Sequence, residues 1–267
     1  MSASEVVTKY KTDNCNPKTD VSGKEIFHFL HIGKTGGTAV KYTLMRDLIL
    51  LEDGGRNNRG TSIVSLPDMP YILKLHSHSI TLKDIPEGEN LIFFLRDPIS
   101  RFVSSFYSRK RKGMPRYFFE WHPEEKAAFQ KFETANELAC SIMSEDSKTS
   151  DAAVKAMKSV FHVNTSFWDW FENKEYFLSR ISDIFFIGFQ ESLDHDFERL
   201  KMKLGLPDTV TLPTDNVEAH KGGYSDSEQF LEEKAIKNLE KWYAKDYEFL
   251  KLCRKIMLPG DNHDKSN

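Results

Sequence analysis

Short apolar runs separated by polar and glycine-rich stretches dominate the pattern of the chain. The first, 26–32 (IFHFLHI), has no polar alternation and ends at Gly33. Such a run is typical of a parallel strand buried on both faces. We expect three further strands at 71–78, 90–98 and 183–189.

The segments between these runs have helical spacing. After Pro98, apolar residues recur at Ile99, Phe102, Val103 and Phe106, which places them on one helix face. Near the end of the chain, Ser225 and Glu228 form a predicted capping box. The expected helices are 38–50, 98 onward, 124–143, 150–158, 191–206 (ended by Gly205 and Pro207) and 225–256.

Strands that alternate with helices predict one α/β domain, with a central parallel sheet flanked by helices and a helical insertion. We place this domain at 26–258, between a polar N-terminal segment, 1–25, and a polar tail, 259–267. The first 25 residues contain no apolar core of a signal peptide, and no run approaches the ~18 apolar residues of a membrane span. This favours a cytoplasmic location, unless the sequence is a trimmed luminal domain.

Composition narrows the classes of function. The 267 residues are 39% hydrophobic and 29% charged, as in ordinary globular proteins, with a formal net charge of −3. A net acidic chain is not typical of nucleic-acid binding.

The glycine-rich stretch after the first strand predicts an anion site. Backbone N–H groups of Gly33, Gly36 and Gly37 can converge on an anion at the start of the next helix. Lys34 adds a positive charge, and the hydroxyls of Thr35 and Thr38 add donors.

The glycine-rich loop is compatible with two further classes of function. Gly33-Lys34-Thr35 matches the tail of a Walker A loop, and Asp97 at the end of 90–98 could be a Walker B carboxylate, which would indicate a P-loop kinase or ATPase. His28 stands where the Walker pattern needs a glycine, and Asp97 before Pro98 is explained more simply as a helix cap. The other alternative is a catalytically inactive module that binds a nucleotide or a carbohydrate.

Four stretches together resemble the sulfotransferase superfamily: HIGKTGGTAV, FFLRDPISRFVSSFYSR, IGFQESLDHDFERLKMKLGL and HKGGYS. The resemblance covers about residues 26–225 and implies the donor 3′-phosphoadenosine 5′-phosphosulfate, with no metal. Residues 33–38 would hold its 5′-phosphosulfate, Arg96 and Ser104 its 3′-phosphate, and the late loop of Lys221, Gly222 and Gly223 would close over the 3′-phosphate or adenine.

The histidines of KLHSHS provide a candidate base. His76 and His78 alternate, so they should share a face, and a neutral imidazole can take a proton from an acceptor hydroxyl. The pair resembles the His-x-His of uronosyl 2-O-sulfotransferases and their bacterial relatives. On this resemblance His78 is the base, His76 supports it and Lys34 stabilises the leaving phosphate; a carboxylate base is the alternative. His31 is expected to pack against the loop.

The acceptor is expected to be a small molecule or an oligosaccharide, and an anionic carbohydrate is favoured. The resemblance suggests the carbohydrate, and the basic stretch SRKRKGMPR suggests the charge, although it could equally be a solvated helix end. Its cations are Arg109, Lys110, Arg111, Lys112 and Arg116. We expect the aromatic segments 117–121 and 167–171 to be core rather than to line the acceptor pocket.

Overall fold

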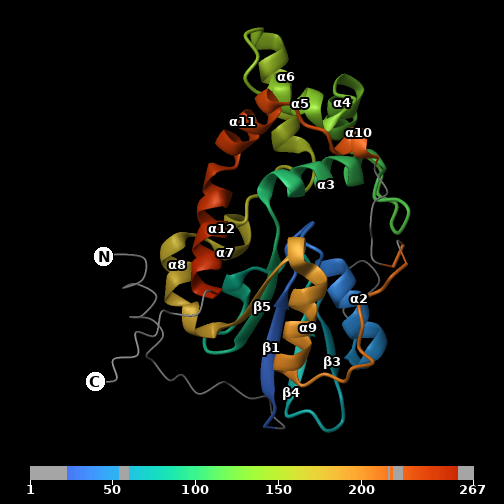
Figure 1. Ribbon diagram of the computed structural model, residues 1–267, viewed down its shortest axis with the longest axis vertical. Coiled ribbons are helices and arrows are strands. Elements are labelled where there is room, and N and C mark those ends of the chain that lie inside the picture. The colour runs from blue at the N-terminus through green and yellow to red at the C-terminus, as the bar shows by residue number, and fades with distance from the viewer. Residues whose placement is uncertain (1–22, 54–59, 216, 219–224, 258–267) are drawn as a thin grey trace.

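A six-stranded mixed sheet lies at the centre of the protein, in the order β2-β3-β4-β1-β5-β6 (Figure 1). The computed structural model describes residues 23–53, 60–215, 217–218 and 225–257. The strands are β1 (Glu25–Leu30), β2 (Ile49–Glu52), β3 (Ser62–Ser65), β4 (Tyr71–Leu75), β5 (Asn90–Leu95) and β6 (Ile184–Phe189).

Four of these strands, β4, β1, β5 and β6, pair in parallel and confirm the predicted strands in their order along the chain. Their carboxyl ends therefore meet at one edge of the sheet, where ligands of open α/β sheets bind. The antiparallel strands β2 and β3 were not predicted. Residues 49 and 50 had been assigned to a helix, but that helix ends at Asp47 and Leu48 is extended.

The helices are α2 (Gly37–Asp47), α3 (Pro98–Lys110), α4 (Pro123–Lys131), α5 (Ala135–Ser141), α6 (Ser147–Ser159), α7 (Trp168–Phe171), α8 (Lys174–Ser179), α9 (Leu193–Leu204), α10 (Asp226–Gln229), α11 (Glu233–Trp242) and α12 (Ala244–Met257). Short 3₁₀ turns lie at Leu82–Asp84, Ile181–Asp183 and Gln190–Ser192.

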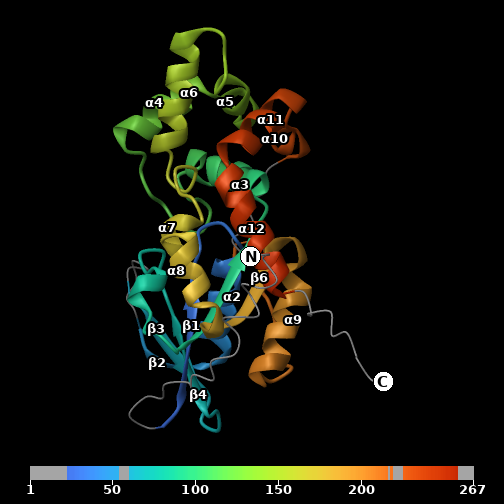
Figure 2. The same ribbon diagram turned by 90° about the vertical axis from the view of Figure 1, so that its left-hand side faces the viewer.

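Helices cover both faces of the sheet and form three layers (Figures 1 and 2). On one face α2 and α9 contribute Val40, Leu44 and Phe197 to a core that includes Phe29 and Phe94. The opposite face has its own core, which α7, α8 and α12 cover. The second core includes Phe93, Leu95, Phe171, Phe177 and Phe249.

The predicted helical insertion forms a lobe above the carboxyl edge of the sheet (Figure 1). Helix α3 lies between the two parts, and α4, α5, α6 and α11 pack beyond it around a third core. We call α4, α5, α6 and α11 the helical lobe. Because α3 has neighbours on both sides, its polar face is buried as well as its apolar one: Arg101, Ser104, Ser105 and Ser108 are all buried.

Two predicted helices are divided in the structure. The region 124–143 is α4 and α5, and Thr134 caps α5 with a capping box of its own. The capping box of Ser225 and Glu228 is present, but it begins only the one-turn α10, and α11 and α12 follow as separate helices. In the described part of the chain, no helix combines the length and the apolar character needed to cross a membrane.

Candidate active site

The loop between β1 and α2, residues 33–38, has the backbone of an anion-binding turn. Lys34 and Gly36 have φ values of 66° and 85°, and Gly36 is the N-cap of α2. The side-chain hydroxyl of Thr35 donates to the carbonyl of Ile32 at 3.0 Å and fixes the start of the turn. A side chain at Gly37 would come within 2.6 Å of the His31 ring, so this position requires glycine. We call residues 33–38 the phosphate loop.

Lys34 is the cation of this loop and is held in an unfavourable electrostatic environment. Burial lowers its pKa to about 7, and the charges of Arg96 and Arg111 contribute to the same shift. A bound anion would favour the charged form of this lysine. The surroundings of Lys34 therefore favour the binding of an anion at this loop.

Arg96 follows β5, the parallel neighbour of β1, and so lies beside the phosphate loop. Its guanidinium donates from Nη1 to the Lys34 carbonyl at 3.5 Å and from Nε to the Ser100 hydroxyl at 2.8 Å. Ser104 lies one turn beyond Ser100 on α3 and is 8% exposed. The order of the strands thus brings the two predicted phosphate sites to the same edge of the sheet.

Asp97 is a helix cap, as one of the two interpretations predicted. Its Oδ1 accepts from the backbone N–H of Ser100 at 2.9 Å, and Oδ2 accepts from the hydroxyl of Tyr247 at 3.0 Å. Both carboxylate oxygens thus accept hydrogen bonds from other residues of the protein. Among the described residues, no group of three or more acidic, cysteine or histidine side chains could hold a metal ion.

His78 lies against the phosphate loop. Its Nδ1 is 2.9 Å from the carbonyl oxygen of His31, and the two rings are 4.0 Å apart. Because a carbonyl only accepts, Nδ1 must carry the proton, and Nε2 of the neutral ring is left with a lone pair. Burial lowers the pKa of His78 to about 4, so the ring is neutral at pH 7. A neutral ring with a lone pair on Nε2 can accept a proton, which is the minimum requirement for a general base.

His76 does not share the direction of His78, because β4 ends at Leu75 and the following residues turn. Its Nε2 is 2.7 Å from Nδ1 of His28, and its Nδ1 is 2.8 Å from the Thr61 hydroxyl. His28 in turn contacts the Glu89 carboxylate through Nε2. The expectation that the two histidines share a face is wrong, and His76 lies in a buried polar chain.

Residues that the sequence interpretation did not include complete the surroundings of the loop. Lys41 of α2 donates to the carbonyl of His76 at 2.8 Å. Arg101 donates to the carbonyl of Gly33 at 3.0 Å, although it was assigned only to the polar face of α3. The ring of His162 lies 5.1 Å from that of His78, centroid to centroid. Arg101 belongs to the arginine-rich motif after β5, whereas no sequence signal indicates His162.

The two aromatic segments differ in burial. Phe167 and Phe171 are fully buried, which agrees with the core assignment of 167–171. In the other segment Tyr117, Phe118 and Phe119 are 36%, 63% and 58% exposed, so the core assignment is wrong there.

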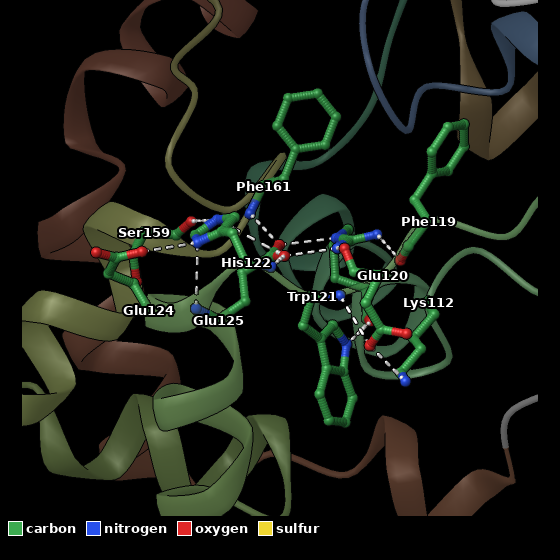
Figure 3. A network of polar contacts seen from close by, with 10 residues as sticks. Lys112, Phe119, Glu120, Trp121, His122, Glu124, Glu125, Ser159 and Phe161 are labelled. Atoms are coloured by element: carbon green, nitrogen blue, oxygen red, sulfur yellow. Dashed lines mark hydrogen bonds and ion pairs between the residues drawn. The ribbon is translucent and has the colours of Figure 1, made fainter.

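The basic stretch after α3 is largely neutralised by partners. Arg109 is buried, and its Nε and Nη2 donate to the Glu125 carboxylate at 2.7 and 2.5 Å. Lys112 pairs with Glu120 at 2.6 Å (Figure 3). The expectation of a cationic cluster that faces the acceptor is therefore corrected. Arg109 is buried in an ion pair that joins α3 to α4. Lys110 is also paired, with Glu133.

The predicted late loop of Lys221, Gly222 and Gly223 lies outside the described residues.

The chain matches a known protein family. A family model described as "Sulfotransferase family" matches residues 17–252, which is most of the chain. No curated protein shows significant similarity to the chain.

Proposed function

The chain belongs to the sulfotransferase family, and from this premise we propose that it transfers a sulfuryl group from 3′-phosphoadenosine 5′-phosphosulfate to a carbohydrate hydroxyl. The observation that carries the proposal is the meeting of Lys34, Arg96 and His78 at one edge of the sheet. They follow β1, β5 and β4, and β1 pairs in parallel with both of the others.

The residues present fit a donor with two separate anionic groups. The phosphate loop offers backbone N–H groups at the start of α2 and the Lys34 ammonium, whose pKa burial and Arg96 have lowered. Arg96 and Ser104 offer a second set of hydrogen-bond donors on α3 and just before it. When bound, the donor supplies the sulfuryl group and leaves as adenosine 3′,5′-bisphosphate.

The chain's own residues divide the chemistry between them. Nε2 of His78 accepts the proton of the acceptor hydroxyl, because Nδ1 is committed to the His31 carbonyl. Lys34 stabilises the negative charge that grows on the phosphate side, as preorganised cations do in transition states. His76 acts at a distance: Lys41 binds its carbonyl, and this contact links the end of β4 to α2.

The hydrogen bonds of the Asp97 carboxylate favour a helix cap over the Walker B aspartate of a kinase or ATPase. Oδ1 of Asp97 accepts from the Ser100 N–H and Oδ2 from the Tyr247 hydroxyl, which are the contacts of a helix cap and explain the aspartate without a metal.

An open aromatic surface supports an extended acceptor. Tyr117, Phe118 and Phe119 are exposed, and Arg116 lies over the ring of Tyr42 on α2 at 4.8 Å, which brings this segment to the helix that follows the phosphate loop. Small-molecule sites usually bury most of their ligand. Exposed aromatic rings can instead stack on the sugar rings of an oligosaccharide, and a neighbouring cation can bind its acidic groups.

Binding and turnover together test the proposal. Adenosine 3′,5′-bisphosphate should raise the melting temperature more than adenosine 5′-phosphate does, because only the bisphosphate fills both sites. Equal shifts from the two ligands, or a magnesium-dependent shift from ATP alone, would contradict the donor assignment. Binding of the bisphosphate without turnover of the labelled donor on any acceptor would indicate an inactive module.

The acceptor is tested by kcat/KM across ionic strength for a uronic-acid oligosaccharide and a neutral one. The value for the anionic acceptor should fall more steeply with salt, since screening weakens attraction at the surface. Arg116→Ala should reduce this difference in slope. Parallel salt dependences for the two acceptors would rule out the anionic preference.

A further inference from the structure

His162 contacts both the phosphate loop and the proposed base, from the segment that joins α6 to α7. Its ring covers Gly33 so closely that a Cβ there would come within 2.5 Å of Nδ1. The same ring meets the His78 ring edge-on, at 5.1 Å and 72°. His162 therefore contacts both the phosphate loop and His78, and a change in its position would disturb the position of each.

The backbone of His162 is held in a conformation that histidine rarely adopts. Its φ is 68°, in the left-handed region, where a Cβ crowds the following carbonyl. Such a conformation persists only where surrounding contacts determine it, and it is commonest at functional sites.

The first of these contacts comes from the helical lobe. The backbone N–H of Phe161 donates to Oε1 of Glu125 at 3.0 Å, and the same carboxylate is bound by Arg109. Figure 3 shows Phe161 and Glu125 joined in this network. The buried ion pair of Glu125 with Arg109, one of the cations that the sequence had suggested for the acceptor surface, thus fixes the residue before His162.

The second set of contacts joins the segment directly to the phosphate loop. The Thr165 hydroxyl donates to the His162 carbonyl at 3.2 Å. Arg101 donates to the carbonyl and the hydroxyl of Thr165 at 2.7 and 2.8 Å, and to the Gly33 carbonyl at 3.0 Å. One guanidinium therefore sets the position of the His162 segment against the loop that its ring covers.

The electrostatic surroundings keep the His162 ring neutral. Burial pushes its pKa well below the ordinary value, and the neighbouring His78 and Lys34 add to the effect. Its Nδ1 is buried with no hydrogen-bond partner in the described structure, and the same holds for Nδ1 of His31, the other ring in contact with His78. These two nitrogens therefore do not fix their rings through a hydrogen bond.

Building on the proposed function, we propose that His162 is a positioning residue for sulfuryl transfer. Its ring and that of His31 both pack against the His78 ring, and the His31 carbonyl accepts from Nδ1. The lone pair on Nε2 then keeps one direction relative to the phosphate loop. The helical lobe sets this direction through Glu125 and the segment that carries His162.

The test compares His162→Gly with His162→Phe. Glycine adopts the left-handed region without strain, so His162→Gly removes the ring and preserves the backbone. His162→Phe keeps a flat ring in the same place. His162→Asn, which also tolerates this region, replaces the glycine variant if the latter does not fold. His195→Asn, at an exposed position on α9, is the matched control.

We expect kcat to fall about 10–100-fold in His162→Gly, because small displacements of catalytic groups are costly. Binding of adenosine 3′,5′-bisphosphate and the melting temperature should stay near the wild-type values. His162→Phe should recover most of kcat, and His195→Asn should match wild type. An unchanged kcat in His162→Gly, or a phenylalanine variant as slow as the glycine one, would overturn a positioning role.

A titration of His78 by NMR gives a readout that does not depend on activity. Lys34 from the loop, Lys41 from α2 and Arg101 from α3 face His78, and all of them remain in the variant. Loss of the His162 ring admits water to His78, so its pKa should rise by about one unit or more toward the ordinary value. An identical pKa in wild type and His162→Gly would reject the proposal. If wild type transfers no sulfuryl group, the proposed function fails, while this titration still decides whether His162 shields His78.

Discussion

Two groups of buried and half-buried histidines lie around the carboxyl end of β1, and they differ in how their nitrogens are satisfied. In the inner pair, His28 and His76, ring contacts run from Glu89 to the Thr61 hydroxyl, and every nitrogen has a partner. In the loop cluster, which comprises His31, His78 and His162, two buried Nδ1 atoms have no partner.

The difference shows how identical side chains in one sequence motif come to have separate roles. A fully paired buried imidazole contributes to stability, because removing it leaves other polar groups unsatisfied. An imidazole with an unshared lone pair near a cationic loop can instead accept a proton. His76 and His78 are two residues apart, yet the turn after Leu75 assigns them to different groups.

The largest expected effect comes from removing one histidine from each group by mutation. His78→Ala should lower kcat by about 10²–10⁴-fold, the usual worth of a general base, with little change in the free energy of unfolding. His76→Ala should lower the free energy of unfolding by about 1–3 kcal/mol for each polar group left unpaired. Steady-state kinetics and urea unfolding measure the two effects, with His195→Ala as the exposed control. Loss of kcat without loss of stability in His76→Ala would remove the distinction between the groups.

Acid should weaken the fold through the inner pair. Burial lowers the pKa of both His28 and His76 to about 3, from the ordinary 6.5. A depressed pKa contributes stability that is complete above pH 6.5 and is lost as pH falls through the folded-state values, because the unfolded chain binds protons first. Between pH 7 and pH 5 the loss should be on the order of 2 kcal/mol per ring. Urea unfolding at several pH values measures it, and a His76→Phe variant should show a shallower dependence. The same slope in both proteins would show that the pair is not responsible.

A smaller effect concerns the charge of Lys34. Since its pKa lies at about 7 in the free protein, kcat/KM should decline above this pH, by up to about tenfold per unit. Bound donor favours the charged lysine, so the decline in kcat should begin at higher pH than that in kcat/KM. On the acid side both should rise through the pKa of His78, at about 4. Coincident alkaline limbs would indicate that Lys34 does not meet the donor.

The sequence predicted the parts of the site that follow strands. The apolar runs predicted that Lys34, His78 and Arg96 follow parallel strands whose ends share an edge, whereas the roles assigned to Arg96 and His78 came from the resemblance and stay predictions. The pattern of apolar residues in α3 also predicted the buried positions Phe102 and Phe106 correctly.

The rest depends on contacts between distant segments. His162 lies in no motif, and a lobe helix, α3 and the phosphate loop together determine its position. The opposite face of α3 looked polar from the sequence, yet Arg101 is buried there because the phosphate loop and the segment around Thr165 and Phe167 cover it. Similarly, a helical pattern over 225–256 does not show that the chain breaks at Tyr243, whose hydroxyl donates to the carbonyl of Val163.

The position of Arg101 has a consequence for the order of folding. Its bonds to Gly33 and Thr165 join residues 68 and 64 positions apart. Contacts that close such long loops lose much chain entropy and tend to form after local helices and turns. The phosphate loop should therefore acquire its final shape late, once the segment carrying His162 has docked. A nascent chain that has the loop but not yet residue 165 would hold an incomplete donor site.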